Sequence, residues 1–370
     1  MNAPAHDIAQ DGSTVKHWWI YQGPGTLAQR MERLSGSLPP WRRFTGTEDP
    51  AYRPPSSGAA WEETRRRGLG YVPDDTETDA VNTALYLRRP LLVTGKPGVG
   101  KTTLAYSIAT DLGLGPVLRW PITSRTAVRD GLYQYDAIGR LHDANLRQLA
   151  AERRSPSVRR AARPRGARPA SSRAASVASY LRLGPLGTAL LPQERPRVLL
   201  IDEIDKGDVD LPGDLLTLFE EGSFEIPELA RAAVHHPQLR IGTQDTPAPD
   251  ARVERGQVQC SAFPVVVMTS NGERDFPPPF LRRCIRLHIE PPGRGKLEQI
   301  VRRRLDVSPA EEPCADLIQE FLDRRADGDL ATDQLLNAIQ LRLSGAWADP
   351  DDHAGLLATA MQQLTGGPRQ

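Results

Sequence analysis

The feature that most constrains this chain is an eight-residue motif between an apolar run and a helical segment. Residues 95–102 read GKPGVGKT and match the pattern G-x-x-x-x-G-K-[ST] completely. Leu91–Val93, before the motif, has the composition of a buried strand, and the residues after it are typical of a helix. This order predicts an α/β domain with a phosphate-binding turn between the strand and the helix.

Each residue type that defines the motif has a chemical purpose in nucleotide binding. Glycines let backbone N–H groups turn inward around a phosphate, and the start of the following helix adds partial positive charge. We expect Lys101 to reach the β- and γ-phosphates and the hydroxyl of Thr102 to bind Mg²⁺. The residues expected to bind ATP are Gly95, Pro97, Gly98, Val99, Gly100, Lys101, Thr102 and Thr103.

A second apolar run ends in two carboxylates. Val198–Ile201 has the pattern of a parallel strand that is buried on both faces, and Asp202 and Glu203 follow it. Ligands of open α/β sheets bind at this edge, so Asp202 is expected to bind Mg²⁺ and Glu203 to orient or deprotonate the attacking water. Asp205 and Lys206 lie just beyond, where a surface ion pair or a helix start is as reasonable as a catalytic role.

A third strand pattern, Val265–Met268, leads to Asn271, which is expected to contact the γ-phosphate or the attacking water. An asparagine after a strand is also a common turn residue, but the two motifs above favour the functional interpretation. Arg282 and Arg283 follow, and we expect Arg283 to reach the γ-phosphate of a neighbouring subunit and to stabilise charge during phosphoryl transfer. The alternative is pairing with a local carboxylate.

Composition and charge exclude several other classes of protein. The net charge is +1, so no global charge points to nucleic acid or a membrane. The three cysteines have no metal-ligand spacing, no apolar run approaches membrane-spanning length, and no targeting signal is visible at the N-terminus. We therefore expect a cytoplasmic protein with no membrane partner and, because only one local segment is strongly basic, no nucleic-acid partner.

Changes in composition and hydrophobic periodicity along the 370 residues predict two modules with tails. Residues 1–70 form an irregular N-terminal arm with several tryptophans, which either pack against the parent domain or bind a partner. Residues 71–292 form the nucleotide-binding domain, beginning with a helix capped at Thr76–Asp79. A small helical domain follows over 293–345, with helices near 297–305, 315–322 and 334–343, and 346–370 form a tail. Two insertions are expected in the nucleotide-binding domain, a disordered basic one at 152–174 and a polar one at 231–256.

The motifs together resemble those of AAA+ ATPases, and within them the MoxR-like branch. The resemblance runs from about Thr76 to Leu343 and is most specific in IDEIDKGDVDLPGDLLTLFEEGSFEIPEL (201–229) and VVVMTSNGERDFPPPFLRRCIRLHI (265–289). LYQYDAIGRL (132–141) is similar to dynein-related members. The resemblance implies a five-stranded parallel sheet, a β-hairpin insertion, a small all-helical lid, and a homo-hexameric ring. It also implies chaperone-like, ATP-driven remodelling of a protein client, often one with a von Willebrand A domain.

One departure from the family pattern keeps a second hypothesis open. The lid of this family often supplies an arginine at the start of a late helix, where this chain has Ala331–Gln334. A nucleotide-gated interaction protein with little turnover is therefore an alternative to a ring ATPase. A nucleic-acid motor would depend on the basic insertion alone, and a GTPase would need an Asn-Lys-x-Asp motif that the sequence lacks.

Overall fold

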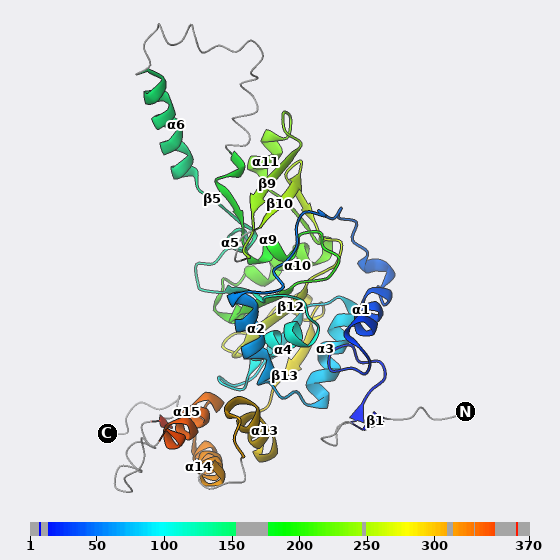
Figure 1. The fold of residues 1–370 in the computed structure, drawn as a ribbon, viewed down its shortest axis with the longest axis vertical. Coiled ribbons are helices and arrows are strands. Elements are labelled where there is room, and N and C mark those ends of the chain that lie inside the picture. The colour runs from blue at the N-terminus through cyan, green and yellow to red at the C-terminus, as the bar shows by residue number, and fades with distance from the viewer. Residues whose placement is uncertain are drawn as a thin grey trace, which may run out of the picture.

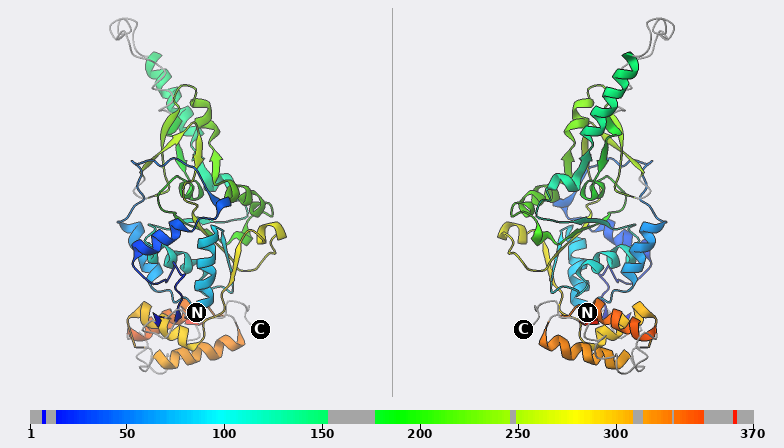
Figure 2. Two further views of the ribbon diagram at one scale, coloured as in Figure 1. Left: turned by 90° about the vertical axis from the view of Figure 1, so that its right-hand side faces the viewer. Right: turned by 90° about the vertical axis from the view of Figure 1, so that its left-hand side faces the viewer.

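The molecule is elongated, and three parts follow one another along its longest axis (Figures 1 and 2). A central sheet with helices lies in the middle. A second sheet and the projecting helix α6 (Ala137–Glu152) form one end, and three helices near the C-terminus form the other. No described helix is both long and apolar enough to cross a membrane. The computed structural model describes residues 7–8, 14–152, 177–245, 249–308, 314–328, 330–344 and 360–361.

The central sheet has five parallel strands in the order β13–β3–β12–β7–β4. Strand β7 is buried along its whole length, with Leu199 and Ile201 in one core and Val198 and Leu200 in the other. Burial on both faces explains why this strand reads as an uninterrupted apolar run. The expected α/β fold with a five-stranded parallel sheet is confirmed. The strands are β3 (Leu91–Thr94), β4 (Leu118–Pro121), β7 (Val198–Asp202), β12 (Val265–Ser270) and β13 (Ile285–His288).

Helices flank this sheet. The first of them, α3, begins slightly before its predicted start, because the capping box is formed by Asp74 and Glu77 rather than within Thr76–Asp79. Helix α4 follows the glycine-rich loop directly. The helices and short helical turns of this domain are α3 (Asp75–Leu87), α4 (Lys101–Asp111), α5 (Val128–Leu132), α9 (Pro185–Ala189), η2 (Ile204–Lys206), α10 (Leu211–Glu221) and α12 (Pro278–Leu281).

The expectation of an irregular arm over residues 1–70 is wrong for much of the part that the structure describes. A short strand pair, β1 (Asp7–Ile8) with β2 (Thr14–Val15), is followed by α1 (Leu27–Gly36), η1 (Pro40–Arg42) and α2 (Ala59–Leu69). Helix α1 has a local start signal that the analysis of periodicity missed, a capping box between Thr26 and Gln29. Helix α2 is held by tertiary packing, since its Gly68 lies directly against the backbone of Tyr106 in α4.

The aromatic residues of the arm divide between the two predicted alternatives. Trp19 and Tyr21 are buried against the parent domain, where Asn82 of α3 accepts hydrogen bonds from the backbone N–H groups of Ile20 (2.6 Å) and Tyr21 (2.9 Å). Trp41 is instead 74% exposed. Packing on the parent domain therefore accounts for Trp19 and Tyr21 but not for Trp41.

A second sheet lies beyond the parallel sheet and was expected only in part, as a hairpin. Its strand order is β5–β6–β9–β10–β11–β8. The segment 231–256, predicted as a polar insertion, contributes β9 and β10, and Ile241, Ala251 and Val253 on them are buried in a core shared with β7. The elements of this part are β5 (Tyr133–Tyr135), β6 (Leu181–Leu183), β8 (Ser223–Glu225), α11 (Pro227–Ala232), β9 (Gln238–Gly242), β10 (Asp250–Glu254) and β11 (Gln257–Gln259).

The C-terminal helices agree with the three predicted segments. They are α13 (Arg294–Leu305), α14 (Cys314–Asp327) and α15 (Thr332–Leu343), and they have a hydrophobic core of their own that includes Leu297, Phe321 and Leu335. We call this unit the lid. The predicted disordered insertion lies outside the described residues except for Glu152, which ends α6, and the predicted tail does so except for residues 360–361.

Candidate nucleotide-binding site

The glycine-rich loop needs glycine at positions where the chain turns sharply. Gly95 and Gly98 have φ angles of 148° and 76°, a region that side chains rarely allow. A Cβ atom on Gly95 would lie 2.5 Å from the carbonyl oxygen of Ile289, and one on Gly98 would lie 2.2 Å from the Cβ atom of Ala331 in the lid. The loop is therefore approached by Ile289, the residue after β13, and by Ala331 of the lid.

Lys101 connects this loop to the end of β12. Its ammonium group donates to the carbonyl oxygens of Gly95 (2.7 Å) and Lys96 (2.9 Å) and to Oδ1 of Asn271 (2.8 Å). Burial lowers the pKa of Lys101, and the nearby carboxylates of Asp205 and Asp202 act in the opposite direction. The structure thus brings together two residues that the sequence predicted separately.

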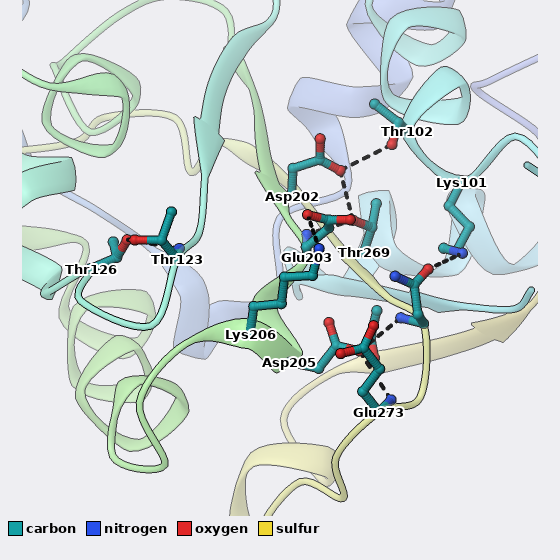
Figure 3. Close-up of polar contacts among 12 residues, drawn as sticks. Lys101, Thr102, Thr123, Thr126, Asp202, Glu203, Asp205, Lys206, Thr269 and Glu273 are labelled. Atoms are coloured by element: carbon teal, nitrogen blue, oxygen red, sulfur yellow. Dashed lines mark hydrogen bonds and ion pairs between the residues drawn. The ribbon is translucent and has the colours of Figure 1, made fainter. Parts of the chain in front are cut away.

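Thr102 and Asp202 also meet, as predicted for a magnesium site. The Thr102 hydroxyl donates to Oδ1 of Asp202 over 3.0 Å, and the Thr269 hydroxyl donates to the same oxygen over 2.8 Å (Figure 3). Thr269 is a site residue that the sequence analysis missed. It lies next to Asp202 because β12 and β7 are parallel neighbours in register.

Arg119 was also missed. It lies on β4 between the buried residues Leu118 and Trp120, and its guanidinium donates through Nε (3.1 Å) and Nη2 (2.7 Å) to Oδ2 of Asp202. A charged residue inside an apolar strand was a visible signal, but only the pairing of β4 with β7 shows which carboxylate it reaches.

Glu203 stands at the edge of the site in an unusual backbone conformation. Its φ angle is 61°, which is uncommon for a residue with a side chain and occurs often at functional sites. Its carboxylate accepts a hydrogen bond from Lys206 over 2.8 Å, and its side chain is 44% exposed. This ion pair matches the structural role that was one of two expectations for Lys206.

Asp205 organises the end of β12. Its Oδ2 accepts hydrogen bonds from the Ser270 hydroxyl (2.9 Å) and from the backbone N–H groups of Asn271 (2.8 Å) and Glu273 (3.2 Å). The side chain is buried, so the contact is not a surface ion pair, and Asp205 lies in η2, in agreement with the expected helix start. Asp205 therefore orients Asn271, which in turn contacts Lys101.

Most of these groups, but not Gly95 or Asp205, line one cavity of about 570 Å³ between the sheet and the lid. The lid contributes Lys296 and Arg304 from α13 and Ala331 and Thr332 from the start of α15. The backbone N–H of Thr332 donates to the carbonyl oxygen of Gly98 over 3.4 Å, so the lid contacts the glycine-rich loop directly. Of the predicted site residues, those that line the cavity are Pro97, Gly98, Val99, Gly100, Lys101, Thr102, Thr103, Asp202, Glu203 and Asn271.

Arg283 does not line this cavity. Its guanidinium pairs with Glu220 of α10 in the same chain, and the side chain is 43% exposed. This is the local pairing that was the alternative to a role at a neighbouring subunit. The adjacent Arg282 is exposed; its backbone N–H donates to the carbonyl oxygen of Pro278 (3.1 Å), and its carbonyl oxygen accepts a hydrogen bond from Arg89 (3.1 Å).

The donor groups fit Mg²⁺. Thr102 and Asp202 present oxygen atoms at the cavity wall, which is the ligand type that Mg²⁺ prefers, and Mg²⁺ commonly uses one or two protein ligands with phosphates and water. Among the described residues no group of three or more His, Cys, Asp or Glu side chains could hold a metal ion. A metal that arrives with a nucleotide needs no such cluster.

Comparison with protein families agrees with this geometry. Residues 90–284, more than half of the chain, match the model of the AAA domain, dynein-related subfamily. The chain belongs to this family. AAA domains of this kind are parts of AAA+ ATPases, which generally bind ATP with Mg²⁺ and commonly form oligomers. A comparison with curated proteins found no match.

Proposed function

We propose that this AAA+ ATPase binds ATP with Mg²⁺ in the cavity between the sheet and the lid and hydrolyses it to remodel a protein client. The observation that carries the proposal is that the Lys101–Asn271 and Thr102–Asp202 contacts lie in one cavity of about 570 Å³. This volume is in the range of small-molecule and cofactor sites. The lid and the glycine-rich loop both line it.

Each side chain has a proposed role that follows from its chemistry. Lys101 neutralises charge on the β- and γ-phosphates, and the loop from Gly95 to Thr103 binds them through backbone N–H groups. Thr102 and Asp202 hold Mg²⁺, which would neutralise charge that develops on the phosphate oxygens. Glu203 orients and deprotonates water, and Asn271, held by Asp205, positions the γ-phosphate or that water.

We further propose a homo-hexameric ring in which Arg283 acts on the nucleotide of the next subunit. Because Arg283 lies outside the cavity of its own chain, a direct role would require another subunit. Contact with that subunit would have to replace the ion pair with Glu220. The sequence of residues 201–229 supports assignment to the MoxR-like branch and, with it, a client that contains a von Willebrand A domain.

The test is ATP hydrolysis measured together with oligomer mass. We expect Glu203→Gln to keep ATP binding and to lose turnover by about 10²-fold to 10⁴-fold, as expected when a general base is removed. Glu221→Gln, an exposed carboxylate on α10, is the matched control and should keep turnover. Wild-type protein that binds Mg²⁺ and ATP but hydrolyses none when assembled would contradict the proposal.

Mixing variants tests the position of the arginine. Arg283→Ala should lower turnover by about 10³-fold or more if its charge stabilises phosphoryl transfer. Mixed with Glu203→Gln protein, it should recover part of the activity, because some interfaces then combine an intact Glu203 with an intact Arg283. No recovery of ATP hydrolysis in assembled mixtures would contradict a role of Arg283 across the interface. Arg282→Ala in the same assay would show whether the adjacent arginine acts across the interface instead.

A nucleotide-gated interaction protein is the second candidate, and the lid favours it modestly. No arginine is present among Ala331, Thr332 and Asp333, where the start of α15 borders the cavity. Nucleotide would then act mainly by changing the contact between Thr332 and Gly98. The same client affinity with ATP, with ADP and without nucleotide would exclude this candidate.

A further inference from the structure

Four hydrogen bonds saturate the carboxylate of Asp202. Thr102 and Thr269 donate to Oδ1, and Arg119 donates twice to Oδ2. The Asp202 side chain is 9% exposed, whereas that of Arg119 is 49% exposed and lines the cavity. The only cation within hydrogen-bond distance of this carboxylate, among the described residues, is therefore the most exposed of its partners.

Two N–H groups of Arg119 donate to one carboxylate oxygen, and such charge-assisted hydrogen bonds are stronger than those between neutral groups. Exposed ion pairs contribute little to stability on average. Because Arg119 is half exposed, solvent also weakens its ion pair with Asp202. The carboxylate, however, is the group proposed to bind Mg²⁺. A contact that is weak for overall stability is then still strong enough to change metal binding severalfold.

We propose that Arg119 is a positioning residue that holds Asp202 when no metal is bound and competes with Mg²⁺ for it. This inference rests on the proposed function, because it needs Mg²⁺ at Asp202. Arg119 lies on the face of the sheet that carries α4, because its neighbours Leu118 and Trp120 face the other core. It therefore approaches Asp202 from the side of Thr102, and its guanidinium leaves the carboxylate by rotating into the cavity.

The competition has a defined consequence for nucleotide affinity. Without metal, nucleotide binding leaves the Arg119–Asp202 contact in place. With Mg²⁺, binding includes breaking the contact. The free energy of that step lowers the affinity measured with Mg²⁺ but not the affinity measured without it, so the ratio of the two affinities reports on Arg119.

The experiment uses the full chain and a fluorescent, non-hydrolysable ATP analogue. Its dissociation constant is measured in excess EDTA and in excess Mg²⁺ for wild type and for Arg119→Gln. We expect the ratio of affinity with Mg²⁺ to affinity in EDTA to rise by about threefold to tenfold in the variant, the effect of a partly exposed two-point contact. Loss of positive charge alone would also raise the ratio, because the metal-free nucleotide is more negative than its Mg²⁺ complex, so competition additionally requires the affinity with Mg²⁺ itself to rise.

Two further variants make the result specific. Arg119→Lys keeps the charge but loses the planar fork, so its ratio should lie between those of wild type and Arg119→Gln. Arg125→Gln removes an exposed arginine from the loop after β4 and should leave the ratio unchanged. Analogue binding in EDTA also shows that each variant is folded.

The outcomes separate this inference from the proposed function. A ratio that is unchanged or lower in Arg119→Gln, while wild type binds the analogue more tightly with Mg²⁺, overturns only the role of Arg119. A lower ratio would mean that Arg119 assists the metal-bound state instead of competing with it. Wild type whose analogue binding does not respond to Mg²⁺, or that does not bind the analogue, overturns both.

Discussion

At the scale of single residues, one buried ion pair has partners for all of its side-chain polar atoms except Nε of Arg197. Arg197 and Asp245, both 1% exposed in their side chains, pair through two hydrogen bonds of 3.1 and 2.7 Å. Arg197 also donates to the carbonyl oxygen of Pro116 over 2.9 Å, and the Tyr52 hydroxyl donates to Asp245 over 2.5 Å. Burial, followed by the charge of Asp245, raises the pKa of Tyr52, so this hydroxyl remains a donor. The network connects the N-terminal segment to the start of β7.

Removing one member of this pair should be costly. Arg197→Met leaves the Asp245 charge buried without its partner, and we expect the free energy of unfolding to fall by about 3–5 kcal/mol. Denaturant titration measures it. Arg66→Met is the control, because Arg66 is exposed and its partner Glu63 still pairs with Arg67 in the variant. This substitution should leave the unfolding transition unchanged. Equal effects of the two substitutions would contradict the assigned importance of the buried pair.

At the scale of elements, the contact between the glycine-rich loop and the lid determines the shape of the nucleotide cavity. Gly98 lies directly against Ala331 at the start of α15, where a side chain would not fit. The lid is also held by Lys296, which pairs with Glu77 (2.5 Å) and Asp74 (3.3 Å) at the start of α3. The capping box of α3 therefore serves a second purpose as the attachment point of the lid.

Gly98→Ala should displace the lid from the loop. The new Cβ atom would overlap Ala331, and the φ angle of 76° adds backbone strain, so we expect weaker nucleotide binding and greater protease sensitivity in the lid. Gly213→Ala is the matched control, since Gly213 lies in α10 with open space around it and should tolerate alanine. Nucleotide affinity and limited proteolysis give the comparison. If nucleotide affinity and protease sensitivity in Gly98→Ala equal those of wild type, the contact between Gly98 and Ala331 does not determine the position of the lid.

At the scale of the whole molecule, three hydrophobic cores lie along the chain. Two lie on opposite faces of the parallel sheet, and the third is inside the lid. All three cysteines are buried and form no disulfide, with Cys260 and Cys284 in one sheet core and Cys314 in the lid core. Burial of Cys260 and Cys284 links the stability of the sheet core to pH.

Alkaline pH should destabilise the folded protein through Cys260 and Cys284. Burial raises the pKa of each thiol from 9.0 to about 12. Between these values the folded form keeps protons that the unfolded form loses, so the free energy of unfolding falls as the pH rises from 9 toward 12. Denaturant titration at several pH values measures this slope. The Cys260→Ala/Cys284→Ala variant should have a shallower slope, and an identical slope would assign the effect to other groups.

The sequence by itself determined the features that depend on neighbouring residues. The glycine-rich loop, the apolar strands with polar ends and the three lid helices each have a signal within one short segment, so the parallel sheet and the meeting of Lys101, Thr102, Asp202 and Asn271 could be predicted. The packed arm and most of the second sheet were not predicted, because their elements are short and are stabilised by distant segments.

Only the tertiary structure decided which groups meet across strands that are far apart in the sequence. The register of β4, β7 and β12 brings Arg119 and Thr269 to Asp202, and no periodicity within one strand contains that information. The same applies to Arg283, whose partner Glu220 lies on another element. Hydrophobic pattern and turn chemistry act over a few residues, whereas the geometry of a site depends on the alignment of whole elements.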